Sequence, residues 1–272
     1  MKTIHLSKET NEIQRIIALR NSRNKRYRTQ EFIIEGTTAI EQAFKHNWPV
    51  KALFFNREIK LSDWAKHYIY NKYVEQVYAI PQELMVKISD RATCPEIIVV
   101  GQTNLLSFDS YTPRKPAIVL VLDEPKSAGN VGTIIRSSVA FQVDAIVISG
   151  HGADEYDPKC IRSSVGCFFS IPIYRADGFA KFLKKVDSLK TTLTVEIIAT
   201  SDKGSVCIDD LKCNSDILFL ILGNETKGIS EGYKNIANQV SRIPLLSEFT
   251  SLNIGVAASI FLYEIDKKRR FK

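Results

Sequence analysis

The chain has 272 residues, of which 44% are hydrophobic and 25% charged, and its formal net charge is +7. This length allows two domains or one large α/β domain, and the composition is ordinary for a soluble globular protein. A helix needs about eighteen consecutive apolar residues to span a bilayer, and no apolar run approaches that length. The polar N-terminus is not a secretory signal. We therefore expect a cytoplasmic protein without membrane contact.

The cysteines, histidines and basic residues narrow the class of partner. Five cysteines without a C-x-x-C pair predict neither a disulfide framework nor a zinc site, and the four histidines lack the spacing of metal ligands. We therefore expect no metal. The positive charge favours an anionic partner, although many soluble proteins carry such a charge and bind nothing acidic.

The N-terminal stretch begins with a predicted helix over residues 11–20, where Ile13, Ile16 and Ile17 have helical spacing. The basic stretch 21–30 is predicted to be a loop. A solvated charge run and a contact with RNA both explain it, because Arg and Lys bind phosphates and Tyr27 can stack on a base. The candidate RNA-binding residues are Arg23, Lys25, Arg26 and Arg28 here and Arg162 later in the chain.

Two predicted domains follow from the remaining pattern. Strands are predicted at 32–34, 52–55 and 97–100, and helices at 38–46 and 81–89. The polar segment 107–116 contains two prolines and no periodicity, which predicts a linker between a small domain, 1–106, and a larger domain, 117–272.

The larger domain alternates strands and helices, which predicts an α/β fold with a mostly parallel sheet covered on both faces. Ligands of such sheets bind beyond the carboxyl ends of the strands. The predicted strands are 117–123, 145–149, 167–174 (after a long polar loop), 195–200, 217–222 and 243–246, and the predicted helices are 130–141, 179–190 and a final helix that begins after residue 253.

Polar clusters follow two of these strands. Gly223, Asn224 and Glu225 end the strand 217–222, and glycine there allows a ligand to approach the main chain. Ser251 and Asn253 precede the final helix, where helix capping is the simpler interpretation. The segment GNVGTIIR matches neither a P-loop nor a dinucleotide-binding motif.

Three stretches together resemble a known family. DEPKSAGNVGTIIRSSVAF, GNETKGIS and IPLLSEFTSLNIGVAASIFLYE resemble, in order, the three motifs of the SpoU (TrmH-like) RNA 2′-O-ribose methyltransferases of the SPOUT superfamily. FIIEG and KISDRATCPEIIVVG resemble the L30e-like RNA substrate-binding domain that precedes the catalytic domain in many members. The resemblance implies methyl transfer from S-adenosylmethionine to RNA, ribosomal RNA being expected before transfer RNA, together with a trefoil knot and a homodimer.

The resemblance also implies site residues. The expected catalytic residues are Asn130, Arg136, Glu225, Ser251 and Asn253, and the expected cofactor-binding residues are Thr200, Leu222, Gly223, Asn224, Ile243, Leu245, Leu252 and Asn253. The family's arginine, here Arg136, has been proposed as general base. A guanidinium almost never loses its proton, so an alternative is that Arg136 holds an RNA phosphate and acts electrostatically.

Two departures from the family pattern keep rival functions open. The family often has a glycine within the segment that is 247–250 here, and often Ser or Ala at Gly255. A non-catalytic RNA-binding protein that kept the fold is one alternative. A methyltransferase acting on a small molecule or a protein is another, which the basic N-terminal stretch disfavours.

Overall fold

The computed structural model describes residues 3–70, 74–91, 93–246 and 251–270. The chain forms two compact units. Unit 1 comprises Met1–Asn104 and Asp154–Ser170, and unit 2 comprises Leu105–Ala153 and Ile171–Lys272. Within the described residues, no helix is long and apolar enough to cross a membrane.

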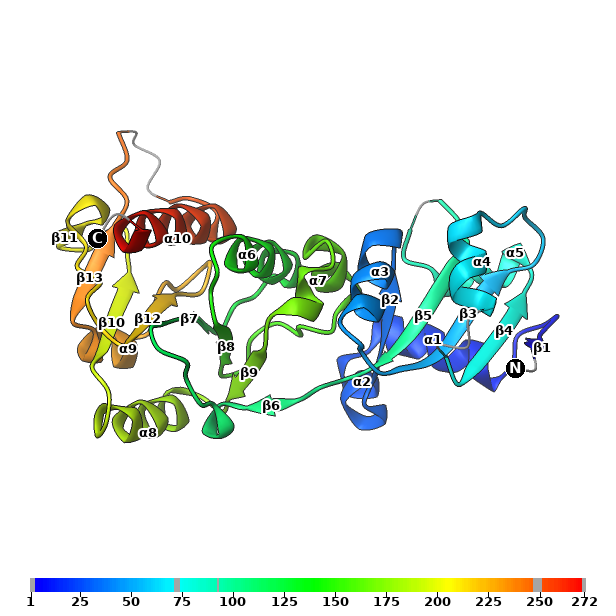
Figure 1. Cartoon of the computed structure of the whole chain (residues 1–272), viewed down its shortest axis with the longest axis horizontal. Helices are drawn as coiled ribbons and strands as arrows, with labels where there is room; N and C mark the ends of the chain where they lie inside the picture. Colours follow the sequence, from blue (N-terminus) through cyan, green and yellow to red (C-terminus); the bar gives the residue numbers. More distant parts are fainter. Residues whose placement is uncertain (1–2, 71–73, 92, 247–250, 271–272) are drawn as a thin grey trace. The chain divides into compact units, whose positions relative to one another are not determined.

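Unit 1 is built on a five-stranded mixed sheet with the strand order β1-β4-β3-β5-β2 (Figure 1). Strand β5 runs antiparallel to both β2 and β3, and the other pairings are parallel. The strands are β1 (Thr3–His5), β2 (Glu31–Glu35), β3 (Val50–Asn56), β4 (Gln76–Ile80) and β5 (Ile97–Gln102), and the helices are α1 (Asn11–Asn21), α2 (Arg23–Thr29), α3 (Thr37–Lys45), α4 (Asp63–Tyr70) and α5 (Gln82–Ile88).

Helix α2 corrects the sequence prediction of a loop over 21–30. Ser22 caps the helix by accepting a hydrogen bond from the backbone N–H of Lys25 at 3.3 Å. A buried ion pair of Arg26 with Asp154 holds the same helix from the side. Propensity within this basic stretch is weak, and the tertiary contact of Arg26 decides its conformation.

A segment from the middle of the chain also belongs to unit 1. Residues 154–170 form α7 (Pro158–Ser163) and the 3₁₀ helix η2 (Cys167–Ser170). The rings of Phe168 and Phe169 lie 5.9 and 6.4 Å from that of Phe32 on β2. The predicted strand over 167–174 is therefore wrong in its first half, because these buried aromatic side chains pack into unit 1 and the strand β9 (Ile173–Ala176) begins only after Pro172.

Unit 2 contains an eight-stranded sheet with the order β11-β13-β10-β12-β7-β8-β9-β6, and all of its pairings are parallel. This confirms the predicted parallel α/β fold. The remaining strands are β6 (Leu106–Ser107), β7 (Ala117–Asp123), β8 (Ala145–Ser149), β10 (Val195–Thr200), β11 (Val206–Cys207), β12 (Ile217–Leu222) and β13 (Gln239–Arg242).

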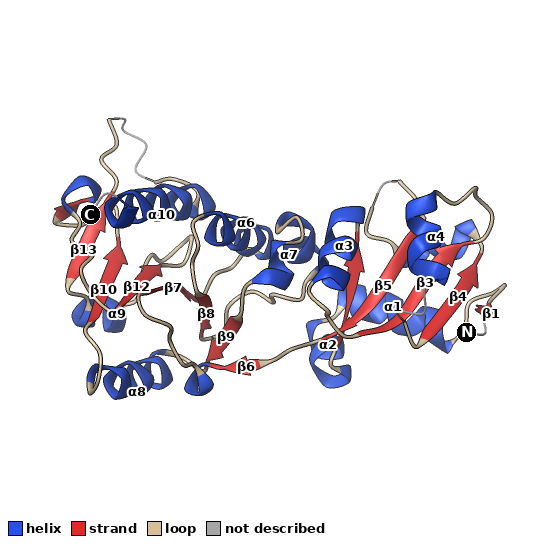
Figure 2. Ribbon diagram, in the orientation of Figure 1, coloured by secondary structure: helices blue, strands red, loops and turns tan. Residues whose placement is uncertain are grey.

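Helices cover this sheet on both faces (Figure 2). The helices α6 (Ala128–Ala140) and α10 (Ile254–Arg270) lie together along one face, while α8 (Phe179–Lys190) lies along the other. The short elements are α9 (Glu231–Ile236) and the 3₁₀ turns η1 (Phe108–Ser110) and η3 (Ile208–Asp210).

Two sequence-based boundaries differ in unit 2. The predicted linker 107–116 carries η1, and its Phe108 and Tyr111 are buried in the core of unit 2. The predicted strand 243–246 is instead β13, four residues earlier, because Gln239–Arg242 pair with β10 and β11. Apolar residues alone do not identify a short strand such as β13, whose sequence QVSR is mostly polar.

Candidate functional site

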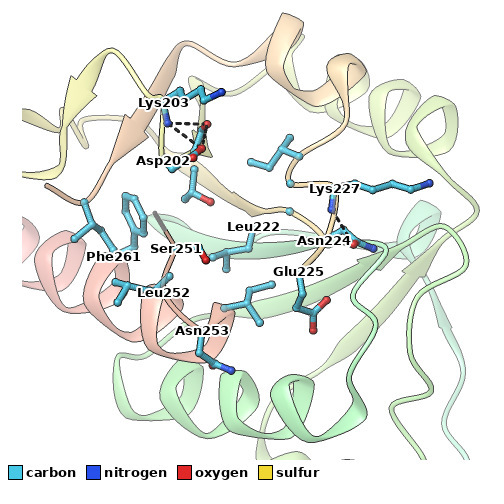
Figure 3. Close-up of a pocket in the computed structure, with 18 of the residues that line it drawn as sticks. Asp202, Lys203, Leu222, Asn224, Glu225, Lys227, Ser251, Leu252, Asn253 and Phe261 are labelled. Atoms are coloured by element: carbon cyan, nitrogen blue, oxygen red, sulfur yellow. Dashed lines mark hydrogen bonds between the residues drawn. The ribbon is translucent and has the colours of Figure 1, made fainter. Parts of the chain in front are cut away.

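The candidate site is a cavity of about 960 Å³ in unit 2. It lies at the carboxyl ends of β10 and β12 and is bordered by Ile243 and Leu245 after β13 and by the start of α10 (Figure 3). Strand ends of this kind are the usual ligand-binding edge of a parallel sheet. Residues from all three motif stretches line it, as does Thr200 at the end of β10.

A tight turn after β12 forms one wall. A Cβ atom at Gly223 would lie 2.2 Å from the carbonyl carbon of Gly228, so only glycine fits there. Asn224 exchanges two backbone hydrogen bonds with Gly228, at 3.0 and 2.9 Å. The Asn224 side chain donates to the carbonyl of Glu124 at 2.7 Å and accepts from the backbone N–H of Thr226 at 2.9 Å. Asn224 lines the cavity, but its amide group holds the turn.

Three polar side chains join the motif stretches into one network. Glu225 accepts hydrogen bonds from the backbone N–H groups of Lys126 and Ser127, at 2.9 and 3.2 Å, and from the amide of Asn130 at 2.9 Å. The Asn130 side-chain oxygen accepts from the amide of Asn253 at 3.2 Å. The amide orientation of Asn130 is therefore fixed from both sides.

Asn253 performs the capping role as well. Its side-chain oxygen accepts from the backbone N–H of Gly255 at 2.8 Å, at the first turn of α10. Capping and the link to Asn130 use different atoms of the same amide, so the two interpretations of Asn253 are compatible. Ser251 lines the cavity two residues earlier.

The electrostatics of Glu225 follow from this network. Partial burial acts to raise the pKa of Glu225. The hydrogen bonds from Asn130 and from the backbone at Lys126 and Ser127 outweigh that effect, and the pKa lies below its ordinary value. Glu225 is therefore an ionised hydrogen-bond acceptor at neutral pH rather than a proton donor.

Apolar side chains form the other wall. All predicted cofactor-binding residues line the cavity, and the apolar ones are Leu222, Ile243, Leu245 and Leu252. Leu245 and Leu252 are exposed, although Leu222 is buried. The segment 247–250, where the chain departs from the family pattern, lies outside the described residues.

Sequence reasoning missed several lining residues. Asp202 and Lys203 directly follow β10 and lie on the opposite side of the cavity from Glu225 and Asn253 (Figure 3). The signal for them was present, because the polar segment Ser201–Gly204 follows a correctly predicted strand. Lys227, Lys234 and Phe261 also line the cavity, and Phe261 gave no signal because its spacing is that of a core residue of α10.

Arg136 is placed differently from the other motif residues. It lies on α6, is exposed, and does not line the cavity. Asn130 and Arg136 are six residues apart on this helix, a rise of about 9 Å along its axis. Within the described residues no hydrogen bond or ion pair engages the Arg136 guanidinium, so it is accessible to an anion.

Arg26, one of the predicted RNA-binding residues, is buried. That residue is 2% exposed. Its guanidinium donates to Asp154 at 2.7 Å and to the carbonyls of Leu19 and Arg20 at 2.7 and 3.1 Å. A buried guanidinium with these partners cannot bind a phosphate, so the assignment of Arg26 to RNA is corrected to a structural role.

The other basic candidates are nearer to solvent. Arg162 is exposed and forms an ion pair with Asp90 at 2.9 Å, and Arg23 stacks over the ring of Tyr27 at 5.1 Å. Tyr27 itself contacts Glu155 through its hydroxyl at 3.2 Å, and Arg23 covers one face of its ring. The basic residues of α2 that stay near solvent are Arg23, Lys25 and Arg28.

Comparison with family models assigns the chain. Residues 117–263 match the SpoU rRNA Methylase family, and residues 11–99 match the SpoU L30e-like domain. The chain belongs to the SpoU methylase family. The predicted family is thereby confirmed, and the cavity of this SpoU methylase is the place where its three motif stretches meet.

Full-length relatives share both parts of this SpoU methylase. The 23S rRNA (uridine(2479)-2′-O)-methyltransferase of Streptomyces viridochromogenes is 33% identical over 93% of this chain and 88% of its own length. The 23S rRNA (guanosine(2553)-2′-O)-methyltransferase RlmP of Bacillus subtilis is 27% identical over 90% of this chain and 92% of its own length.

A solved structure agrees with the fold of this SpoU methylase. The SpoU methyltransferase AviRb from Streptomyces viridochromogenes, in complex with the cofactor AdoMet, superposes with a TM-score of 0.90. The match has 31% sequence identity and covers 96% of this chain and 99% of AviRb.

Proposed function

We propose that this protein transfers the methyl group of S-adenosylmethionine to the 2′-hydroxyl of a ribose in ribosomal RNA. The observation that carries the proposal is the network Glu225–Asn130–Asn253, which joins the three motif stretches at the edge of one cavity. Two relatives that match this chain along nearly their whole length are named as 2′-O-methyltransferases of 23S rRNA. Their names support the reaction and the class of RNA. Such a substrate is cytoplasmic, which is where we place the enzyme.

The residues of the cavity fit S-adenosylmethionine. A volume of about 960 Å³ is at the upper end of the roughly 300–1,000 Å³ typical of small-molecule sites. The apolar side chains of Leu222, Ile243 and Leu252 would enclose the adenine. Gly223 removes any side chain between the cofactor and the main chain, and the Asp202 carboxylate could accept hydrogen bonds from hydroxyl or amino groups.

The chain itself has to align the hydroxyl and manage one proton, because the bound cofactor supplies a methyl group already activated by its sulfonium. Asn130, held by Glu225 and Asn253, presents a fixed amide at the edge of the cavity. Ser251, which also lines the cavity, offers a hydroxyl that can donate or accept a hydrogen bond.

We assign Arg136 to holding an RNA phosphate rather than to proton abstraction. Its guanidinium is exposed, which suits a phosphate contact, and guanidinium groups are poor proton acceptors in proteins. Fixed positive charge next to the substrate favours the alkoxide that forms as the hydroxyl loses its proton.

We further propose a homodimer formed through α6 and α10. These helices pack on each other through the hydroxyl contact of Ser137 with Ser259 at 2.7 Å. Val256 and Tyr263 of α10 remain 48% and 57% exposed. Apolar side chains exposed on one face are typical of an interface between subunits. The trefoil knot predicted from the family stays a prediction.

The deciding experiment is transfer of labelled methyl from S-adenosylmethionine to RNA from cells that lack the protein. Digestion to nucleosides should place the label in a 2′-O-methyl nucleoside of ribosomal RNA, and Asn130→Ala and Arg136→Ala should each lose most of it. Cofactor binding by calorimetry is measured in parallel. A chain that binds RNA but no cofactor would instead be a non-catalytic RNA-binding protein, and label confined to transfer RNA would correct the substrate.

A further inference from the structure

The described residues that line a second cavity, of about 480 Å³, all belong to unit 1. One side is the turn that joins α3 to β3, residues 46–49, and another is the end of β5 with the two residues that follow it, 102–104. Phe169 from η2 completes the lining. None of the described motif residues of the SpoU methylase lines this cavity.

A fixed indole ring forms the aromatic part of this cavity. Trp48 donates its ring N–H to the carbonyl of Gln102 at 2.8 Å. Its ring packs against those of Phe168 and Phe169, with centroids 5.6 and 5.2 Å away. Trp48 nevertheless lines the cavity and is only half-buried. A planar ligand could stack on a ring that has already lost its conformational freedom.

The polar side chains around the indole are amides, a hydroxyl and the imidazole of His46. Asn47 and Asn104 line the cavity with exposed amides, which both donate and accept hydrogen bonds. Thr103 is 9% exposed, and within the described residues its hydroxyl has no hydrogen-bond partner. Buried hydroxyls are normally satisfied. No Lys, Arg, Asp or Glu is among the described lining residues, which favours an uncharged heterocycle over a phosphate.

Positive charge lies beside the cavity rather than in it. The backbone N–H of Thr103 donates to the carbonyl of Gln30 at 2.9 Å, and Gln30 directly follows α2. Arg28, in the last turn of α2, is exposed. A stacking surface with neutral hydrogen-bonding groups and a neighbouring cation is the combination that unpaired nucleotides require.

We infer that this cavity holds one unpaired base of the substrate RNA, stacked on Trp48 and hydrogen-bonded by the amides of Asn47 and Asn104, with a flanking phosphate at Arg28. The inference rests on the proposed function, since it assumes that RNA is the substrate. It adds the class of RNA feature recognised: a base outside any duplex, read by unit 1.

The two tryptophans of the chain make a direct test feasible. In a full-length Trp64→Phe variant, Trp48 is the sole indole fluorophore. Stacking of a base should quench its emission saturably with a short single-stranded RNA and far less with the same sequence in a duplex or with the four mononucleotides. In this background Asn104→Ala should raise the dissociation constant obtained from the quenching titration about fivefold to tenfold, because one hydrogen bond contributes roughly 1 kcal/mol.

A second readout uses variants of the stacking ring. Trp48→Leu should weaken single-strand binding, measured by fluorescence anisotropy, about tenfold, since stacking is worth roughly 1–3 kcal/mol per base. Trp48→Phe should restore part of the affinity, and urea denaturation confirms that both variants fold. If RNA leaves the Trp48 emission of the Trp64→Phe variant unchanged while RNA binding and methyl transfer are intact, this inference alone is overturned. Quenching by mononucleotides but not by RNA would overturn it in favour of a free-nucleotide site. Absence of both RNA binding and methyl transfer would overturn the proposed function as well.

Discussion

The polar network at the cavity of unit 2 and the ion-pair cluster of unit 1 each join segments that are distant in sequence. Glu225, Asn130 and Asn253 lie at the surface of an open cavity. Arg26 and Asp154 are 2% and 6% exposed. Both sets are charged or polar and both are well hydrogen-bonded, so access to solvent is what separates them: the first can meet a substrate, and the second can only support the fold.

The cluster in unit 1 also fixes a segment of the chain. Asp154 begins the stretch 154–170, which packs with unit 1 although the chain before and after it belongs to unit 2. Burial raises the pKa of Asp154, and the attraction of Arg26 opposes that effect. A buried pair of this kind destabilises strongly when one partner is removed, because the other charge is left without compensation.

The largest effect is therefore expected on stability and in unit 1. Arg26→Ala should lower the free energy of unfolding by about 3–5 kcal/mol, since it leaves Asp154 buried and unpaired. Urea denaturation followed by circular dichroism measures this change. Arg28→Ala, two residues along the same helix but exposed, is the matched control and should change stability by less than about 0.5 kcal/mol. Equal effects of the two substitutions would contradict the contrast drawn between the two networks.

The second effect is expected on activity and in unit 2. Glu225→Gln replaces an oxygen that accepts from Asn130 or from the backbone by an amide donor, so one hydrogen bond becomes a donor–donor contact. We expect methyl transfer to fall about tenfold to a hundredfold, with stability changed by less than about 1 kcal/mol. The control is Glu83→Gln, which removes an exposed ion pair with Lys87 in unit 1. Unfolding of the Glu225 variant, with activity lost in proportion, would make this network structural too.

A smaller effect is expected on RNA binding by α2. Arg28→Ala should weaken binding at low salt and reduce by about one the slope of log affinity against log salt concentration, as the loss of one phosphate contact does. Arg57→Ala, an exposed arginine of unit 1 outside α2, is the control. Titrations at several salt concentrations provide the measurement. An unchanged slope would mean that Arg28 does not contact an RNA phosphate, just as the buried Arg26 does not.

The smallest effect concerns pH. Because the folded-state pKa of Glu225 is lowered, its ionised form contributes stability that is present above the ordinary carboxyl pKa and is lost as the pH falls through the folded value. The wild-type protein should exceed Glu225→Gln in stability by under about 1 kcal/mol at neutral pH, since the group is exposed and screened. This difference should vanish in acid. A stability difference between the two proteins that grows as the pH falls would contradict this prediction.

The sequence by itself determined the family, the parallel sheet and the motif residues that line the cavity. Long apolar runs such as 217–222 and the periodic helix 179–190 carry enough local information to place an element, and β12 and α8 have these same bounds. Gly223 and Glu225 were identified because residues at strand ends must lie at the ligand-binding edge of such a sheet.

Only the tertiary structure decided which polar residues are buried. Arg26 and Arg28 look alike in the sequence, and the difference between them comes from Asp154, which is 128 residues from Arg26 in the chain. The side-chain amide of Asn224, a predicted cofactor-binding residue, bonds to the distant carbonyl of Glu124 and to the backbone of its own turn. Arg136 lies on the motif helix but outside the cavity. Local patterns report spacing along the chain, whereas the role of a charged or polar group depends on which distant segments remove water from it.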